Sequence, residues 1–381
     1  MKIGIHNQCE GAGIGGSEVC VGVLAAALSH AHQVEVLHHR PQMSREALEA
    51  ISGMDLRRVS IRCVKNDPEP EKTINLWKHY RQKVRYNAHL SEPYDLFVTF
   101  VQRPPPFCHA RHGLAVILFP HFRQGHLMAA GVGRVYRAWL WRRQMQTYNA
   151  VTVISEFCRT WAERNWGLDC QVFYPPVDVD YQSVDKENII VSVGRFAGTG
   201  VSKQQPEMAR AFTYLDNDDW SYLSAGGLSN AAEDQVYFDH VSRIAQGHPI
   251  QLLPNVGRAE LKSIYERASI FWHAAGFSED AEAHPHLMEH FGITTVEAMA
   301  AGCVPVVVKK GGQTEIVQHG VNGFCWETLE ELQRYTALLM QDKSLCRQMS
   351  KAARERAQDF SRERYVARFC EITGVRIEAP L

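Results

Sequence analysis

The sequence has no long hydrophobic run. None of its apolar stretches approaches the roughly 20 residues that a membrane-spanning helix needs. Its 10 cysteines are scattered, without a Cys-x-x-Cys pair, which argues against a disulfide framework and favours free thiols in a reducing compartment. The chain opens directly into a strand-like segment, Met1-Lys-Ile-Gly-Ile-His, without the hydrophobic region of a signal peptide. We therefore expect a cytoplasmic protein that is soluble or, at most, peripheral on the inner face of a membrane.

The chain also has almost no net charge. Its 41 Lys and Arg residues and 42 Asp and Glu residues leave a formal charge of −1. That balance excludes the overall basic field of a typical nucleic-acid-binding protein, so we expect no nucleic-acid partner and only local anion sites. A hydrophobic content of 45% with 22% charged residues is ordinary for a soluble globular protein, and 381 residues are enough for two domains.

Short apolar runs that alternate with helical or looped segments predict the domain organisation. The strands predicted in the first half lie at residues 2–6, 33–38, 94–101, 115–119 and 150–154, and a helix of small residues is predicted at 17–29. The strands predicted in the second half lie at 189–193, 222–225, 250–253, 270–273 and 304–308. Strands that alternate with helices imply a parallel sheet covered on both faces, here one in each half.

The segment Tyr174-Pro-Pro-Val-Asp178 separates the two halves. Its two prolines force an extended chain and remove backbone donors, so the segment predicts a strand end that leads into a linker. Two polar helices are predicted near the end of the chain, at 329–339 and 346–360. We therefore expect one domain over 1–180 and a second over 186–355.

The most informative stretch is Glu289-His-Phe-Gly-Ile-Thr-Thr-Val-Glu297, which an Ala-rich helix and a buried strand follow. Gly292 permits a sharp turn, and the helix after it directs its first N–H groups back at that turn, where they stabilise an anion such as a phosphate. Glu289 before the turn and Glu297, expected in the first helical turn, can hold hydroxyl groups. A nucleotide-diphosphate sugar combines these two kinds of group.

A glycine-rich loop follows the first predicted strand. Gly11-Ala-Gly13-Ile-Gly15-Gly16-Ser17 formally matches the dinucleotide-binding pattern, which would indicate an NAD-dependent oxidoreductase. The loop begins too late after the strand, however, and the second strand lacks the terminal acid that binds ribose. The preferred interpretation is a loop whose Gly15 and Gly16 approach a phosphate, and the alternative is a purely structural turn.

Two further segments place polar side chains at the ends of predicted strands. Arg195 and Lys203 lie on one loop after the first strand of the second domain, where two cations can neutralise a diphosphate. His121 follows a strand of the first domain, where the first domain's side of a ligand-binding cleft is expected. The alternatives are two solvated surface cations and a histidine that hydrogen-bonds to the backbone.

The spacing of the histidines and acids predicts no metal site. His284, His286 and His290 do not follow a usual zinc pattern, and Pro285 separates the first two. Asp178-Val-Asp180 has the letters of a metal-binding Asp-x-Asp but falls in the predicted linker.

Together these motifs resemble family 4 of the retaining glycosyltransferases. The resemblance rests on Glu-x7-Glu with Phe-Gly between the acids, on Ala301-Gly-Cys-Val-Pro305-Val-Val, and on Gly311-Gly312-Gln-Thr-Glu315-Ile-Val. Within the family, Glu-His-Phe-Gly-Ile and Tyr174-Pro-Pro-Val-Asp178 are most similar to mannosyltransferases that extend lipid-linked oligosaccharides, and to their bacterial relatives. The resemblance implies the GT-B fold, in which two doubly wound Rossmann-like domains face a central cleft, and it implies that residues 356–381 cross back to the first domain.

The resemblance also implies roles for the residues above. The catalytic residues would be His121, Arg195, Lys203 and Glu289. The donor-binding residues would be Gly15, Gly16, Phe291, Gly292, Ile293, Thr294, Glu297, Gly311, Gly312 and Gln313. No cofactor is implied beyond the nucleotide-diphosphate sugar, which is the donor substrate.

The implied activity is retaining, metal-independent transfer of a hexose to a hydroxyl of a glycan, a polysaccharide or a lipid-linked acceptor. GDP-mannose is the favoured donor, and a UDP-hexose stays open. The alternatives are an epimerase or hydrolase of nucleotide sugars with the same fold, and a non-catalytic sugar-nucleotide-binding subunit. The segment Arg134-Val-Tyr-Arg137-Ala-Trp139-Leu-Trp141-Arg142-Arg143 indicates either a core helix or a surface that rests on an anionic membrane.

Overall fold

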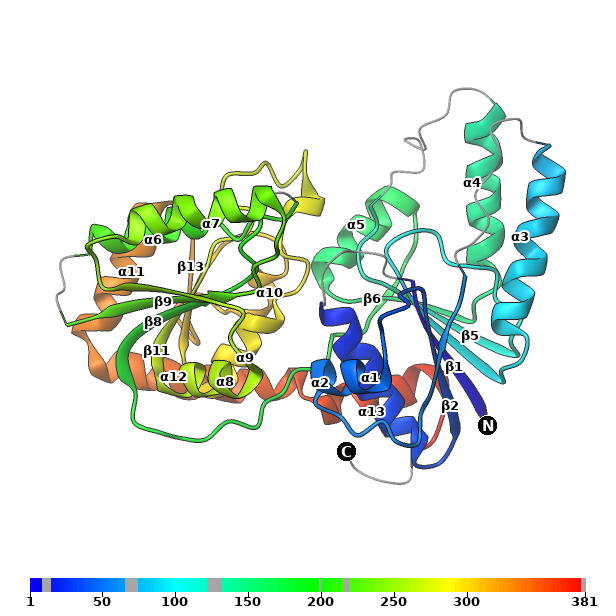
Figure 1. Ribbon diagram of the computed structural model, residues 1–381, viewed down its shortest axis with the longest axis horizontal. Helices are drawn as coiled ribbons and strands as arrows, with labels where there is room; N and C mark the ends of the chain where they lie inside the picture. Colours follow the sequence, from blue (N-terminus) through cyan, green and yellow to red (C-terminus); the bar gives the residue numbers. More distant parts are fainter. Residues whose placement is uncertain (9–14, 66–74, 122–131, 199, 216–218, 378–381) are drawn as a thin grey trace. The chain divides into compact units, whose positions relative to one another are not determined.

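In the computed structural model the chain forms two compact units (Figure 1). Unit 1 consists of Met1–Pro176 and Arg362–Leu381, and unit 2 consists of Val177–Ser361. The structure describes residues 1–8, 15–65, 75–121, 132–198, 200–215 and 219–377, and for residues 132–134 it describes the backbone alone. No helix in these ranges combines the length and hydrophobicity needed to cross a membrane.

Unit 1 is built on a parallel sheet of seven described strands in the order β3-β2-β1-β4-β5-β6-β7. The strands are β1 (Lys2–Asn7), β2 (Gln33–His38), β3 (Ser60–Cys63), β4 (Leu96–Val101), β5 (His112–Ile117), β6 (Ala150–Val153) and β7 (Gln171–Val172). The helices are α1 (Gly16–Ser29), α2 (Arg45–Ser52), α3 (Leu76–Ser91), α4 (Val132–Met145), α5 (Glu156–Trp166) and α13 (Arg362–Thr373). In the central pairing, Ile5 lies opposite Val36 on one side and Val98 on the other.

The core of unit 1 includes residues from the last described helix of the chain. The small side chains of α1 are almost all buried, which lets this helix pack closely on the sheet. Tyr365 and Phe369 of α13 are buried in the same cluster, and the Tyr365 ring stacks on Phe173 with 4.4 Å between the centroids. The Tyr365 hydroxyl donates to the carbonyl of Cys20 at 3.3 Å. Unit 1 therefore needs residues from both ends of the described chain.

Unit 2 is built on a second parallel sheet in the order β10-β9-β8-β11-β12-β13. Its strands are β8 (Glu187–Val193), β9 (Ser221–Gly226), β10 (Ile250–Pro254), β11 (Ala268–His273), β12 (Val304–Val308) and β13 (Phe324–Trp326). Its helices are α6 (Gln205–Thr213), α7 (Ala232–Ala245), α8 (Arg258–Arg267), η1 (Pro285–Leu287), α9 (Ile293–Ala301), α10 (Gln313–Ile316), α11 (Leu329–Gln341), α12 (Lys343–Ala357) and η2 (Gln358–Phe360). Two buried indoles lie in its core, where Trp272 donates to the Thr336 hydroxyl at 3.0 Å and Trp326 to the Val306 carbonyl at 3.3 Å.

Two doubly wound parallel sheets confirm the predicted fold class. Each strand predicted in the sequence overlaps an observed strand, although β5 begins three residues before the predicted start and β1 ends one residue later. The short strands β3, β7 and β13 were not predicted. The sequence-based division placed domain boundaries at 180, 186 and 355; the observed units change at Pro176 and again after Ser361, and α13 lies within the segment 356–381.

Candidate functional site

The predicted site residues of unit 2 follow the carboxyl ends of its central strands. Arg195 comes two residues after the end of β8, and the loop that contains Glu289 follows β11. The strands β8 and β11 are neighbours in the sheet, and the chain leaves them toward opposite edges. In open parallel sheets, ligands bind outside the strand ends at such a switch point.

The structure brings Lys203, Glu289 and His273 into contact. The Lys203 ammonium forms a short ion pair with Oε2 of Glu289, and Nε2 of His273 lies 3.2 Å from the same oxygen. The side chains of Lys203 and Glu289 are 21% and 20% exposed, whereas that of His273 is 3% exposed. The carboxylate of Glu289 is therefore held in one position but still reaches the surface.

The ionisation of this cluster follows from its contacts. Burial alone would raise the pKa of Glu289, but the charge of Lys203 and the hydrogen bond from His273 outweigh it, so its pKa lies well below the ordinary value. Burial lowers the pKa of His273 despite the nearby carboxylate. At neutral pH, Glu289 is therefore an anion and His273 a neutral imidazole that donates its Nε2 proton. The Nδ1 atom of His273 is buried and has no hydrogen-bond partner among the described residues.

Gln205, the first residue of α6, hydrogen-bonds to the start of the loop that carries Arg195 and Lys203. The buried amide of Gln205 donates to the carbonyl oxygens of Gly194 and Arg195, at 3.1 Å each, and it accepts a hydrogen bond from the Tyr237 hydroxyl at 2.7 Å. A side chain at position 194 would come within 2.6 Å of the Lys203 methylenes. Glycine there lets the lysine cross the loop toward Glu289, while the Arg195 side chain stays exposed.

The turn before α9 has the geometry that the sequence predicts. Gly292 caps the helix with a φ of 124° and a ψ of 57°, a conformation that disfavours any side chain. The amide N–H groups of Ile293 and Thr294 start the helix, where they have no carbonyl of a preceding turn to bind. Thr295 in the same turn donates its hydroxyl to Oε1 of the buried Gln313 at 2.9 Å. Free amides at this helix end favour an anion beside Glu289.

The loop at 311–313 packs against the same turn. The N–H of Gly312 donates to the carbonyl of Glu289 at 2.8 Å, so this loop anchors the backbone that carries the carboxylate. Phe291 turns its ring into the interior, where it is 2% exposed and meets Phe360 edge to face at 5.3 Å. Phe291 can therefore contribute only its backbone to ligand binding.

Glu297 lies farther along the helix than predicted. Because α9 begins at Ile293, Glu297 is in the second turn, and no acid occupies the first. The expectation that it lies in the first turn is wrong, since the Phe-Gly turn extends to residue 292 and delays the start of the helix. The Tyr265 hydroxyl donates to Oε2 of Glu297 at 3.4 Å. Burial, followed by the Glu297 charge, raises the pKa of Tyr265, which keeps the phenol protonated.

The predicted site residues of unit 1 lie at the start of α1 and on the segment that follows β5. Gly15 caps α1, and its N–H donates to Oε2 of Glu18 at 3.0 Å. Glu18 is buried and forms an ion pair with Arg40 at 3.4 Å. Gly16 is the first residue of α1, whereas Gly11 and Gly13 lie outside the described residues. His121 follows β5 on the surface, with its ring edge to face against Phe119 at 5.0 Å.

The described residues contain no group of three His, Cys, Asp or Glu side chains that could hold a metal ion. The rings of His284 and His286 are 6.1 Å apart, and Asp178 forms an ion pair with Arg258 at 3.3 Å.

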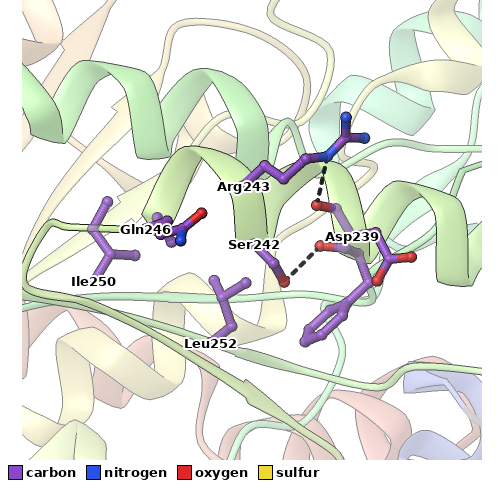
Figure 2. Close-up of a pocket in the computed structure, with 8 residues that line it drawn as sticks. Asp239, Ser242, Arg243, Gln246, Ile250 and Leu252 are labelled. Atoms are coloured by element: carbon purple, nitrogen blue, oxygen red, sulfur yellow. Dashed lines mark hydrogen bonds between the residues drawn. The ribbon is translucent and has the colours of Figure 1, made fainter.

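A separate pocket of about 910 Å³ lies between α7 and the edge strand β10 (Figure 2). Its walls are Phe238, Asp239, Ser242, Arg243, Ala245, Gln246, Ile250 and Leu252, and none of these is a predicted site residue. In Figure 2, Arg243 turns along its own helix, where its Nε donates to the Asp239 carbonyl at 3.3 Å. No cluster of charged groups converges on this pocket in the way that Lys203, His273 and Glu289 converge.

Sequence reasoning missed His273, Gln205 and Tyr265. His273 had a signal, because it is a polar residue at the carboxyl end of an otherwise apolar strand, where ligand-binding groups collect. Gln205 and Tyr265 had none, since each acts through a contact that appears only in the folded unit.

Two family models match the chain. The model described as "Glycosyl transferases group 1" matches residues 177–356, and the one described as "Glycosyltransferase Family 4" matches residues 14–181. The first therefore covers almost all of unit 2, and the second covers most of the first segment of unit 1.

Curated relatives match at low identity. A "GDP-Man:Man(3)GlcNAc(2)-PP-Dol alpha-1,2-mannosyltransferase" of Dictyostelium discoideum is 24% identical over 229 residues, which cover 54% of this chain and 42% of that protein. The protein of the same name from Homo sapiens is 27% identical over 222 residues, which cover 52% of this chain and 42% of that protein. The matches thus span less than half the length of these relatives.

Solved structures match over almost the whole chain. A glycosyltransferase from Rickettsia africae ESF-5 has a TM-score of 0.71 at 15% identity and is covered to 98%, as is this chain. Anabaena Alr3699/HepE, in complex with UDP and glucose, has a TM-score of 0.68 at 18% identity, with 98% of this chain and 99% of that chain covered. At these identities the likeness shows the fold, which is the two-domain Rossmann-like architecture called GT-B.

Proposed function

Because the chain belongs to family 4 of the glycosyltransferases, with its two family matches together extending from residue 14 to residue 356, we propose that it transfers a hexose from a nucleotide-diphosphate sugar to a hydroxyl group. The proposed acceptor is a glycan, a polysaccharide under synthesis or a lipid-linked sugar. Mannose is the favoured donor sugar and GDP-mannose the favoured donor, because the names of the two curated relatives described above begin with GDP-Man.

One observation carries this proposal: the anionic carboxylate of Glu289 lies beside the positive end of α9 and is fixed by Lys203 and His273. A carboxylate with free lone pairs accepts hydrogen bonds from sugar hydroxyls. The amides of Gly292, Ile293 and Thr294 stabilise a phosphate group. A ligand that carries hydroxyls next to a phosphate can bind the carboxylate and the amides at the same time.

Arg195 and Lys203 supply the charge for the reaction. A lysine ammonium has three N–H donors, so Lys203 can contact Glu289 and a phosphate oxygen together. The exposed residue Arg195 follows two residues after the neighbouring strand β8. We assign to both residues the stabilisation of the departing diphosphate, for which removal of one hydrogen-bond donor costs about 10²–10³ in rate. Metal independence is part of the proposal, because these cations take the role of a metal ion.

The proposed reaction retains the configuration of the sugar. The acceptor oxygen bonds to the anomeric carbon on the face from which the diphosphate leaves, the bond to the diphosphate oxygen breaks, and a phosphate oxygen accepts the hydroxyl proton. Glu297 is assigned to the ribose hydroxyls, and Gly311, Gly312 and Gln313 to the sugar. Gly15, Gly16 and His121 are assigned to the donor phosphate and sugar from unit 1. The proposed location is the cytoplasm, with peripheral contact to the inner face of a membrane.

The test is nucleotide release from a panel of GDP- and UDP-sugars, with a metal chelator present and candidate acceptors added or omitted. We expect release that needs an acceptor, survives chelation and falls about 10²–10³-fold in Arg195→Ala. Glu289→Gln, which keeps the shape but removes the charge, should abolish turnover. The matched control is Arg243→Ala, which changes an exposed arginine of the same unit and should leave turnover unchanged. Nuclear magnetic resonance of the product decides between retention and inversion.

Other outcomes point to other functions. Rapid release without any acceptor would favour an epimerase or hydrolase. Tight nucleotide binding without release from any donor would favour a non-catalytic subunit, and unchanged turnover in Arg195→Ala would contradict the role assigned to that residue.

A further inference from the structure

Two helices of unit 1 expose large apolar side chains next to cations. On α3, Trp77 is 60% exposed; on α4, Val135 is 69% and Trp139 is 38% exposed. Lys78 and Arg81 on α3 and Arg143 on α4 are exposed as well. We refer to these six residues as the α3–α4 patch. Solvent-exposed tryptophans are uncommon on a surface that faces only water, so the patch calls for a partner.

The two helices form one surface. The Tyr80 ring of α3 lies 5.2 Å from the Trp139 ring of α4, and Nδ1 of His79 lies 3.0 Å from the Tyr136 hydroxyl. His79 and Tyr80 lie near the start of α3, Tyr136 lies near the start of α4 and Trp139 at its middle. Figure 1 shows that α3 and α4 run in the same direction. Their N-terminal ends therefore lie together. The exposed Trp77 and Val135 lie near these ends.

The charge of the two helices has one sign. The α3 sequence contains Lys78, Arg81, Lys83 and Arg85, the α4 sequence contains four arginines, and neither helix contains an acid. The whole chain, in contrast, has a net charge of −1. Positive helix ends add to this local excess of positive charge. The partner of the patch is therefore anionic.

The ring contacts distinguish between anionic partners. One face of Trp77 is stacked on Tyr80, with centroids 5.4 Å apart, and one face of Trp139 is stacked on Tyr136 at 6.0 Å. Arg81 and Arg143 lie near the same indoles, at 5.8 Å and 5.9 Å from the ring centroids. Base stacking in single-stranded nucleic acids needs open ring faces. Indoles flanked by cations instead match the interface of an anionic bilayer, where tryptophan sits at headgroup depth and arginine contacts phosphate.

We propose that the α3–α4 patch binds unit 1 to the surface of an anionic lipid bilayer, with Trp77, Val135 and Trp139 inserted at the headgroup level and Lys78, Arg81 and Arg143 against lipid phosphates. The patch has the two components, apolar area and cationic charge, that interfacial binding requires. This inference rests on the proposed function in one respect: among the proposed acceptors it favours the lipid-linked sugar, because a membrane would present that acceptor. The binding itself needs neither donor sugar nor acceptor.

The experiment is flotation of the full chain with vesicles of phosphatidylcholine, with or without phosphatidylglycerol, in the absence of sugars and nucleotides. We expect binding only when the anionic lipid is present, and less of it as salt rises, because salt screens the charges. The double variant Lys78→Gln/Arg81→Gln should lower the partition coefficient about 25-fold, at about fivefold for each cation. The double variant Trp77→Gln/Val135→Gln should lower it by about tenfold or more.

Matched controls come from unit 2. Tyr214 and Val236 are 79% and 65% exposed, so Tyr214→Gln/Val236→Gln removes comparable apolar surface elsewhere. Arg347→Gln/Lys351→Gln removes two exposed cations from α12. Both controls should float like the unchanged chain. All variants should keep the thermal unfolding midpoint, since each change is at an exposed position.

The inference is overturned if the chain does not float, if it binds both kinds of vesicle equally, or if the patch variants and the controls behave alike. Binding of a single-stranded oligonucleotide without vesicle binding would assign the patch to nucleic acid instead. A dimer that Trp77→Gln/Val135→Gln dissociates, with no vesicle binding, would assign it to a second copy of the chain. Because nucleotide release from soluble acceptors is measured separately, failure of vesicle binding leaves the proposed transferase activity intact, and the reverse also holds.

Discussion

Glu289 receives its two partners from chain segments that are distant in the sequence. Lys203 lies 86 residues before it, and His273 lies 16 residues before it at the end of a buried strand. Lys203 supplies a positive charge and can also contact a ligand. His273 is enclosed and neutral, so its remaining function is to orient the carboxylate through one N–H bond. We therefore regard His273 as a positioning residue.

We expect His273→Ala to lower kcat/KM by about tenfold, the equivalent of one hydrogen bond to a charged group. Loss of that bond should also raise the pKa of Glu289 toward its ordinary value, so the acid limb of the pH–rate profile should move to higher pH. His273→Gln retains a donor at a similar reach and should restore part of both effects. Equal behaviour of the two variants, measured by steady-state kinetics across pH, would show that His273 acts only through packing.

Sequence patterns predicted the local features of this site but not the contacts between distant segments. The spacing of Glu289, Gly292 and Glu297 indicated a turn and a helix end, because such features depend on neighbouring residues. It could not show that Lys203 pairs with Glu289, nor that Gln205 closes the loop at Arg195, since these contacts depend on how strands β8 and β11 lie in the sheet. The position of Glu297 was misjudged by a single helical turn.

Among the elements, α9 and the Phe-Gly turn before it are the most constrained part of the site. Gly292 has a positive φ, and a Cβ atom there would lie 2.4 Å from Nε2 of Gln313. The amide of Gln313 is in turn held by Thr295. A side chain at 292 must therefore displace the turn, the buried glutamine or the start of the helix.

We expect Gly292→Ala to destabilise the protein by about 1–3 kcal/mol and to weaken binding of GDP and UDP by at least about tenfold, as loss of one charge-assisted hydrogen bond would. Gly247→Ala is the matched control, because Gly247 has a φ of 81° but nothing within 4 Å of its added Cβ. It should lower stability without changing nucleotide affinity. Thermal unfolding and titration calorimetry measure the two quantities, and an unchanged affinity in Gly292→Ala would contradict the role assigned to the turn.

The strands that sequence analysis found and those that it missed differ in length, burial and place in the sheet. Strand β12 consists of five buried residues, Val304–Val308, and such an apolar run is a clear signal. Strand β3, Ser60–Cys63, has no fully buried residue because it lies at an edge of the sheet, and β13 has only three residues. Strands of this kind form because a neighbouring strand offers them a partner, so their own sequences carry little information.

At the scale of the whole molecule, stability depends on histidines buried in neutral form. Burial, with a smaller effect from His39, lowers the pKa of His6 to about 3. Its Nδ1 lies 2.9 Å from the Thr99 hydroxyl, and its Nε2 lies 2.8 Å from Nε2 of His39. Burial also lowers the pKa of His38 and of His273. Each of these groups binds a proton more readily in the unfolded chain than in the folded one.

The lowered pKa of His6 makes the folded protein less stable at acidic pH. The stabilisation from neutral His6 is complete above the unfolded pKa of about 6.5 and is lost as pH falls from there toward the folded value. We expect the free energy of unfolding to fall between about pH 7.5 and about pH 5 by about 2 kcal/mol more in the unchanged chain than in His6→Gln. Urea unfolding at several pH values measures this difference. The exposed His248→Gln is the control, and equal slopes for the unchanged chain and His6→Gln would contradict the assignment.

The position of α13 has a consequence for the order in which the protein is made. Unit 2 is one continuous segment, so all of its residues have been synthesised before Tyr365 and Phe369 are added to the chain. Domains usually fold in the order in which they leave the ribosome. Here unit 1 lacks part of its core until every residue of unit 2 has been synthesised, so the unit whose synthesis starts first can complete its packing only after the other.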